Sequence, residues 1–146
     1  MNTKQKVMVF IARPHGSHYD WLTRRNAPHL GHGGDRWYVV TGNVESGEPL
    51  ETAAIREVQE ETGINSHITL IKLPIIHSYI SNKDTHTEIQ EQAFLLVTTY
   101  NQAIRLNEES TDYLWLQLDK FIDKIWWPKD RQTLKNVLAQ ALGNKK

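Results

Sequence analysis

Acidic residues are concentrated between Glu48 and Thr62, in a segment whose pattern predicts a helix. The segment holds one arginine among five glutamates, which are Glu48, Glu51, Glu57, Glu60 and Glu61. At about 100° per residue, the last three of these fall on one face of a helix. Like charges at such spacings destabilise a helix by roughly a few tenths of a kcal/mol per pair. The last turn of a helix also disfavours anions, so two local rules are broken at one place, as expected of a functional site.

A hard divalent cation would resolve both conflicts. Mg²⁺ or Mn²⁺ binds carboxylate oxygens in octahedral geometry, keeps several waters and accepts substrate phosphates as its remaining ligands. The small side chains of Ala53 and Ala54, one turn earlier, leave room near this face. The alternative is a plain solvated helix face, which is the commoner role of three clustered acids. The cluster therefore indicates a metal site only together with the residues around it.

The surrounding residues fit a known signature without a gap. The pattern G-x5-E-x7-R-E-U-x-E-E-x-G-U, where U is a bulky aliphatic residue, is met by Gly42, Glu48, Arg56, Glu57, Glu60, Glu61 and Gly63, with Val58 and Ile64 in the aliphatic positions. This is the signature of the Nudix hydrolases, and the chain resembles that family. The pattern of strands on both sides of the motif fits the family over most of the chain.

The resemblance implies roles for the signature residues. It implies that Glu57, Glu60 and Glu61 bind metal ions, Mg²⁺ or Mn²⁺, and that the backbone carbonyl of Thr41 can serve as a further ligand. Many relatives have a second glycine at the position of Thr41, and a threonine there leaves the carbonyl in place.

The remaining signature residues are expected to be structural. The resemblance implies that Glu48 and Arg56 form an ion pair that fixes the loop against the helix. It also implies that Gly42 allows close approach to the site and that Gly63 ends the helix.

The implied reaction is attack of water on phosphorus, which cleaves a phosphoanhydride bond in a substrate linked to a nucleoside diphosphate. The metals would neutralise phosphate charge and lower the pKa of the water. The candidate general bases are Glu60 and Glu61 in the helix and Glu91 or Glu88 further along the chain. Several relatives place an extra metal-binding acid near the position of Glu91. The alternative for Glu91 is a polar residue at the entrance of an apolar strand.

The stretch RWYVVTGNVESGE favours one subgroup of the family. It resembles bacterial enzymes that hydrolyse deoxynucleoside triphosphates or dihydroneopterin triphosphate and release pyrophosphate. Tyr113, Trp115, Trp127 and Arg131 resemble the C-terminal part of the same subgroup. A dinucleoside polyphosphate hydrolase is the second interpretation, although that subgroup more often has Pro-Lys-Gly before the helix. A nucleotide-binding module without catalysis is the alternative from another class, and such proteins typically lose signature acids that are all present here.

Substrate contacts are predicted less sharply. Trp21 could stack on a base, because base stacking needs an aromatic face, and Arg24 and Arg25 could meet phosphates. The chain carries 17 basic and 17 acidic residues. Binding to a nucleic-acid backbone normally shows a basic excess, so a small nucleotide is the expected partner and a nucleic acid is not. The resemblance also allows a homodimer, since relatives are often dimers.

The elements predicted around the motif make one domain over residues 1–146. Strands are predicted at 6–13, 20–25, 36–41, 68–73, 75–80, 92–99 and 113–118, with loops at 26–35 and 81–90. Helices are predicted from Pro49 to Thr62, over 118–125, and from Pro128 onward. This pattern favours an α+β or α/β domain, and the resemblance implies an α/β/α sandwich with a mixed sheet. The chain has no cysteine and no apolar run of membrane-spanning length, so we expect a cytoplasmic protein outside the membrane.

Overall fold

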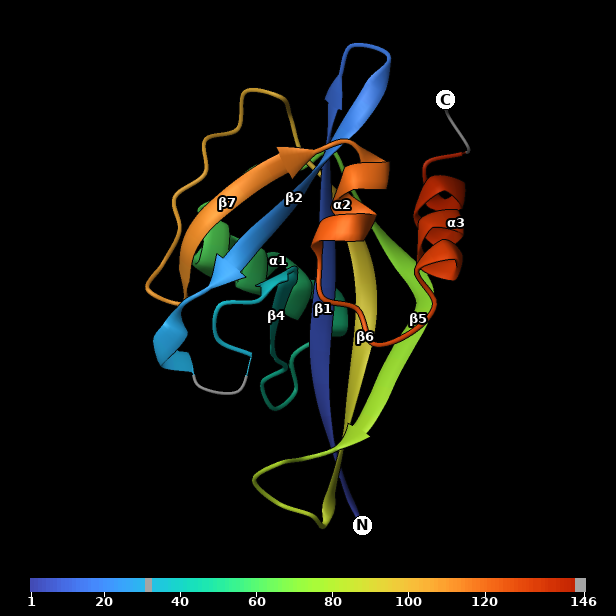
Figure 1. The fold of residues 1–146 in the computed structure, drawn as a ribbon. Helices are drawn as coiled ribbons and strands as arrows, with labels where there is room; N and C mark the ends of the chain where they lie inside the picture. Colours follow the sequence, from blue (N-terminus) through green and yellow to red (C-terminus); the bar gives the residue numbers. More distant parts are fainter. Residues whose placement is uncertain (31–32, 144–146) are drawn as a thin grey trace.

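The computed structural model describes residues 1–30 and 33–143, so residues 31–32 of the predicted loop 26–35 lie outside the described part of the chain. A seven-stranded mixed sheet is flanked by helices (Figure 1). The strands are β1 (Asn2–His15), β2 (His18–Asn26), β3 (Trp37–Tyr38), β4 (Val40–Asn43), β5 (Thr69–Ile80), β6 (Thr87–Val97) and β7 (Ser110–Leu116). The helices are α1 (Leu50–Thr62), α2 (Leu118–Lys124) and α3 (Arg131–Ala141), with a 3₁₀ turn η1 (Pro28–Leu30).

Strand β1 organises the sheet because it pairs along both edges. One edge runs parallel to β6 over almost its whole length, and β5 adds antiparallel to the far side of β6. The other edge is shared: residues 6–9 pair with β4 and residues 12–15 pair with β2. Strand β7 then pairs with β2. Strand β2 accompanies β1 only near the hairpin, and β2 and β7 turn away from the N-terminal half of β1 (Figure 1).

The sheet separates two apolar layers, as the alternation of side chains along β1 requires. Val7, Val9 and Ile11 pack with α1 in one buried cluster, which also includes Ala53, Ala54 and Val58 of the helix. Met8, Phe10 and Ala12 face the other way and pack with Phe121 of α2 and with Leu134 and Leu138 of α3. Helix α1 therefore covers one face, and α2 and α3 cover the other (Figure 1). The predicted sandwich of helices around a mixed sheet is confirmed.

Several predicted strand boundaries are wrong, each because pairing with a distant strand overrides a local signal. β1 continues through Pro14, since its pairing with β6 ends at Ala12 and only β2 accompanies it further. The strands predicted at 68–73 and 75–80 are one strand, β5, with a shift of register around Pro74. An edge strand tolerates proline there. The strand predicted at 36–41 is divided into β3 and β4, which pair with different neighbours.

The correction that matters for the site concerns β6. Its prediction began at Gln92, after a polar loop, whereas the strand starts at Thr87. Parallel pairing with the N-terminal half of β1 holds this polar stretch extended. Glu88 and Glu91 therefore lie within a strand.

The predicted helices are close to those observed. Pro49 is the N-cap of α1, one residue before the helix, and Gly63 ends it with a positive φ of 76°. The last helix starts at Arg131 and not at Pro128, because the Asp130 side chain accepts hydrogen bonds from the backbone N–H groups of Gln132 and Thr133. Among the described residues, no helix is long and apolar enough to cross a membrane.

Candidate active site

Helix α1 is held in place by small apolar side chains that it buries beside its acidic residues. Ala53, Ala54 and Val58 are fully buried against the sheet. Gly63 adopts the left-handed conformation that glycine favours at a helix end, and its N–H donates to the carbonyl of Gln59 at 2.9 Å. The last two turns of the helix are therefore fixed relative to β1 and β4.

Glu57 lies directly on Gly42 of β4. A Cβ atom added to Gly42 would be 1.9 Å from the Glu57 Cδ atom, so no other residue fits at this position while the glutamate keeps its conformation. The carboxyl group of Glu57 is thus placed beside the Thr41–Gly42 peptide, which carries the Thr41 carbonyl. Burial raises the pKa of Glu57, because desolvation disfavours the charged carboxylate.

Glu61 is the most buried of the signature acids, with an exposed fraction of 1%. The Arg24 guanidinium on β2 donates to its carboxylate at 2.6 Å and forms a buried ion pair with it. Burial nevertheless raises the pKa of Glu61 to about 8, and the nearby negative charges of Glu109 and Glu57 act in the same direction. Without a bound cation, the positive charge of Arg24 does not balance the negative charges around an ionised Glu61.

Glu60 is different, because its side chain is 55% exposed at the solvent edge of the helix. Among the described residues it forms an ion pair with Arg56, at 3.4 Å. Glu60 can therefore turn toward the other two carboxylates or toward solvent without breaking a buried contact.

Arg56 fastens the signature loop to the helix. Its guanidinium donates to both carboxylate oxygens of Glu48, at 2.8 and 2.9 Å, and to the backbone carbonyl of Asn43 at 2.8 Å. It also reaches Glu57 at 3.0 Å. Hydrogen bonding from Arg56 lowers the pKa of Glu48 to about 2. The structure thus contains the loop-to-helix ion pair that the resemblance implied.

The donor set fits a hard divalent cation. Glu57, Glu60 and Glu61 supply carboxylate oxygens from one end of one helix, and Thr41 supplies a carbonyl beside Glu57. The contact between Gly42 and Glu57 leaves no space for a Cβ atom, so this backbone and this carboxyl group approach closely, as shared ligation needs. Oxygen-only donors of this kind suit Mg²⁺ or Mn²⁺.

The structure does not bring Glu91 to these acids. Along β6, Glu91 alternates in step with Ala93 and Leu95, which pack under α2 and α3, so it points to the sheet face opposite α1. Its register partner is Lys6, whose own partner on the far edge is Asn43, which places Glu91 about 10 Å from β4. Glu91 is 5% exposed and lies in a polar group of its own.

That polar group neutralises Glu91. The Tyr79 hydroxyl donates to its carboxylate at 3.2 Å, His77 Nδ1 lies 3.4 Å away and Lys6 Nζ 3.9 Å away. The pKa of Tyr79 is raised by burial and by the charge of Glu91. If Glu91 takes part in the reaction, it must therefore act from the sheet face opposite α1.

The predicted substrate contacts need correction. Trp21 is 2% exposed and packs against Phe121 in the core under α2, so its face is not available for stacking on a base. Arg24 is 4% exposed and is engaged with Glu61. Arg25 is accessible, but it is paired with Asp35 at 3.1 Å and with Asp112 at 3.7 Å. Alternation along β2 turns Arg24 to the sheet face opposite that of Trp21 and Arg25, and Arg25 differs from Trp21 because it lies at the open end of the strand.

Sequence reasoning missed two groups near the site. Glu109, just before β7, adds its charge to the environment of Glu61, and its backbone carbonyl accepts a hydrogen bond from Ala27 at the end of β2. Trp126 is 38% exposed, and the Arg36 guanidinium lies 4.3 Å from the centre of its ring. Two consecutive glutamates just before the last strand, Glu108 and Glu109, were a usable signal for Glu109.

Comparison with characterised proteins places the chain in a family. Residues 2–137 match the NUDIX domain model. The chain is 25% identical over 134 residues to an octanoyltransferase from Myxococcus xanthus, covering 91% of this chain but 36% of that protein. It is 28% identical over 92 residues to the nucleoside triphosphatase NudI from Escherichia coli, covering 60% of this chain and 65% of that one. The chain thus spans about a third to two thirds of the length of these relatives.

Solved structures share the fold across the whole domain. The Ap4A hydrolase of C. elegans in a binary complex superposes with a TM-score of 0.76 at 18% identity, over 97% of this chain and 98% of that one. The dihydroneopterin triphosphate pyrophosphohydrolase of E. coli superposes with a TM-score of 0.68 at 22% identity, over 99% of both chains. These structures show the fold, and the family model that matches residues 2–137 shows that the chain belongs to the NUDIX domain family.

Proposed function

We propose that this protein hydrolyses a phosphoanhydride bond in a small substrate linked to a nucleoside diphosphate, with the help of Mg²⁺ or Mn²⁺. The observation that carries the proposal is the carboxylate cluster at the end of α1. Glu57 is seated on Gly42, and Glu61 is buried with an unfavourable excess of negative charge around it. A protein without need of cations would have little reason to keep these acids together.

Glu57, Glu60, Glu61 and the Thr41 carbonyl are the residues that would hold the metal. When bound, a divalent ion neutralises phosphate charge and makes a coordinated water a better nucleophile. The protein's own groups have two further tasks. Arg56 holds the loop carrying Gly42 against the helix through Glu48, and Arg24 holds Glu61 in its buried position.

The water that attacks phosphorus needs a proton acceptor. Glu60 and Glu61 are candidates on the helix, and we add Glu109 because it approaches Glu61 from the segment before β7. Glu91 stays a candidate only through the opposite face of the sheet. Parallel kinetics of the Glu→Gln variants at these four positions would identify the base as the variant that loses turnover while retaining metal affinity.

The substrate that we favour is a deoxynucleoside or pterin triphosphate, cleaved to a monophosphate and pyrophosphate. The preference rests on the resemblance of the segments around Gly42 and Trp115 to that subgroup. Trp126 is an exposed tryptophan on which a base could stack, and the Arg36 guanidinium beside its ring supplies positive charge. A dinucleoside polyphosphate is the second candidate, and the similarity in fold to an Ap4A hydrolase favours keeping it.

The deciding experiment measures phosphate and pyrophosphate release with Mg²⁺ over a panel of substrates. The panel contains deoxynucleoside and ribonucleoside triphosphates, dihydroneopterin triphosphate, diadenosine tetraphosphate and nucleotide sugars, with Glu61→Gln as the control. We expect pyrophosphate from a triphosphate and none in the control. Turnover of dinucleotides or sugars alone would replace the substrate but keep the chemistry. A silent panel with nucleotide binding intact would indicate a binding module and overturn the proposal.

A further inference from the structure

A second group of ligand-type side chains lies at the hairpin between β1 and β2. His15 ends β1 and His18 begins β2, and the two are directly opposite in the register, as are Arg13 and Asp20. The turn between them contains Gly16 at a positive φ of 61°. Because side chains alternate along a strand, all four of these residues lie on one face of the hairpin. A tight turn thus brings two imidazoles and a carboxylate together.

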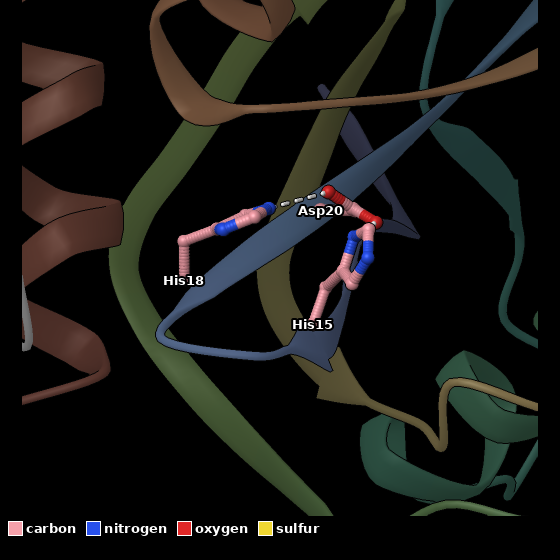
Figure 2. Close-up of side chains that lie close together, drawn as sticks. All are labelled: His15, His18 and Asp20. Carbon is pink, nitrogen blue, oxygen red and sulfur yellow. Dashed lines mark hydrogen bonds and ion pairs between the residues drawn. The ribbon is translucent and has the colours of Figure 1, made fainter.

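The contacts within this group are direct (Figure 2). Asp20 Oδ2 lies 2.8 Å from His15 Nδ1, and Asp20 Oδ1 lies 3.2 Å from His18 Nε2. The three potential ligand atoms all lie within 4.8 Å of one another. Two ligands of one metal ion at about 2.1 Å are themselves roughly 2.9–3.4 Å apart. Each imidazole nitrogen is at such a distance from a different oxygen of Asp20, so shared ligation needs both carboxylate oxygens or a small rotation of the carboxylate, and the two imidazole nitrogens must approach each other.

The two histidines of this group are accessible to solvent, whereas the aspartate is buried. Asp20 is 6% exposed, whereas the side chains of His15 and His18 are 47% and 37% exposed. Because the carboxylate is buried beneath two more exposed rings, an ion can reach the group from solvent and keep water molecules as further ligands. An arrangement of three protein ligands with open positions is common in metal sites.

Arg13 fixes the carboxylate from behind. Its Nε donates to Asp20 Oδ2 at 3.2 Å, and its guanidinium lies between the rings of Tyr100 and Trp115, at 4.4 and 4.2 Å from their centres. A carboxylate offers about four lone-pair positions, so it can accept from Arg13 and still ligate. Outer contacts of this type orient ligands in metal sites generally.

The same arginine decides which class of ion fits. Its positive charge balances Asp20, so a hard cation such as Mg²⁺, which depends on carboxylate charge, gains little here. Imidazole nitrogens supply the remaining affinity, and these suit Zn²⁺, Cu²⁺ or Ni²⁺. We infer that His15, His18 and Asp20 form a binding site for a Zn²⁺-class ion, separate from the acids of α1. Asp20 and Arg24, the partner of Glu61, are about 13 Å apart along β2, and the hairpin projects away from the loop that precedes α1 (Figure 1).

The test is titration of tag-free, full-length protein with Zn²⁺ by calorimetry, in the presence of excess Mg²⁺ to occupy the acids of α1. His15→Gln and His18→Gln are the test variants, and both change accessible side chains at a hairpin. His86→Gln changes an exposed histidine elsewhere and is the matched control. Losing even an outer partner of a metal ligand typically costs 10–100-fold in affinity. Each test variant should therefore lose more than about tenfold in Zn²⁺ affinity, while the control keeps the affinity of the unchanged protein.

A second readout reports on the ligands themselves. Cu²⁺ bound at this site should give an electron paramagnetic resonance spectrum with coupling to imidazole nitrogen, and His15→Gln should weaken that coupling. Zn²⁺ binding that survives both histidine variants, that disappears in Glu61→Gln instead, or that is undetectable at micromolar Zn²⁺ would overturn the inference. Hydrolysis of the substrate panel plays no part in these readouts, so this inference and the proposed function fail independently.

Discussion

Glu61 on α1 and Glu91 on β6 are both buried glutamates, yet their surroundings are opposite in charge. Glu61 has one cation, Arg24, and two further acids, Glu57 and Glu109, around it. Glu91 has a lysine, a histidine and a tyrosine hydroxyl beside its carboxylate. Burial alone therefore does not mark a metal site. An excess of carboxylates over cations favours one, because an added cation removes a repulsion that the metal-free protein can relieve only by protonation.

Removal of divalent cations should have the largest effect. If the acids of α1 act through a metal, a chelator should abolish turnover, and excess Mg²⁺ or Mn²⁺ should restore it. The measurement is pyrophosphate release before and after chelation and after re-addition. Turnover that resists the chelator would mean that the charge excess around Glu61 has another purpose.

Glu61→Gln should come next. Loss of one ligand or base at a site that contributes roughly 4 kcal/mol to the transition state lowers kcat by about 10³-fold. The fold should persist, because glutamine keeps the shape and its side-chain oxygen can still accept the hydrogen bond from Arg24. Circular dichroism controls for folding, and near-normal kcat in this variant together with Glu60→Gln would refute the assignment of the metal ligands.

Gly42→Ala tests the placement of Glu57 without changing an acid. The added methyl group would overlap the Glu57 carboxyl, and displacement of a reacting group by about 1 Å can cost roughly 10²-fold in rate. Gly47→Ala is the control in the same loop, since nothing lies within 4 Å of a Cβ there, although its φ of +76° adds backbone strain that Gly42, which has no positive φ, does not have. A loss in Gly47→Ala as large as that in Gly42→Ala would point to a general disturbance of the loop and not to a displaced carboxylate.

The stability of the metal-free protein should depend on the protonation of Glu61. Its pKa rises from 4.5 in the unfolded chain to about 8 in the folded protein, so the folded state binds the extra proton between these values. Stability is then greatest on the acid side and falls as the pH rises from about 4.5 to about 8. Calorimetric Tm values with a chelator, compared with those of Glu61→Gln, isolate this contribution. A difference between the two proteins that does not change with pH would contradict it.

Glu91→Gln should have the smallest effect on turnover and a visible one on stability. Loss of the charge leaves Lys6 and His77 facing a neutral amide, and an unsatisfied buried group costs about 1–3 kcal/mol. Urea unfolding measures the loss, and steady-state kinetics checks that kcat is little changed. A kcat as low as that of Glu61→Gln would reinstate Glu91 as a ligand or base and would remove the contrast between the two glutamates.

Local spacing determined much of this protein in advance. The signature from Gly42 to Ile64, the bounds of α1 and its terminal Gly63 follow from helical period and backbone preference, which act within a few residues. A single domain of mixed strands and helices also followed, since the periods of apolar residues distinguish the two kinds of element, whereas the α/β/α layering was implied by the resemblance to the family. These features need no knowledge of what lies elsewhere in the chain.

Tertiary structure alone decided the partners. Arg24 reaches Glu61 across 37 positions of sequence, and Glu109 arrives from beyond β6. Trp21 was a candidate for stacking on a base but enters the core, and Glu91 was a candidate metal ligand or base but faces away from α1. Each outcome depends on which strands pair and in which register, because a shift of one residue turns a side chain to the other face. Pairing between strands distant in sequence sets that register, so single residues carry too little of the information to predict it.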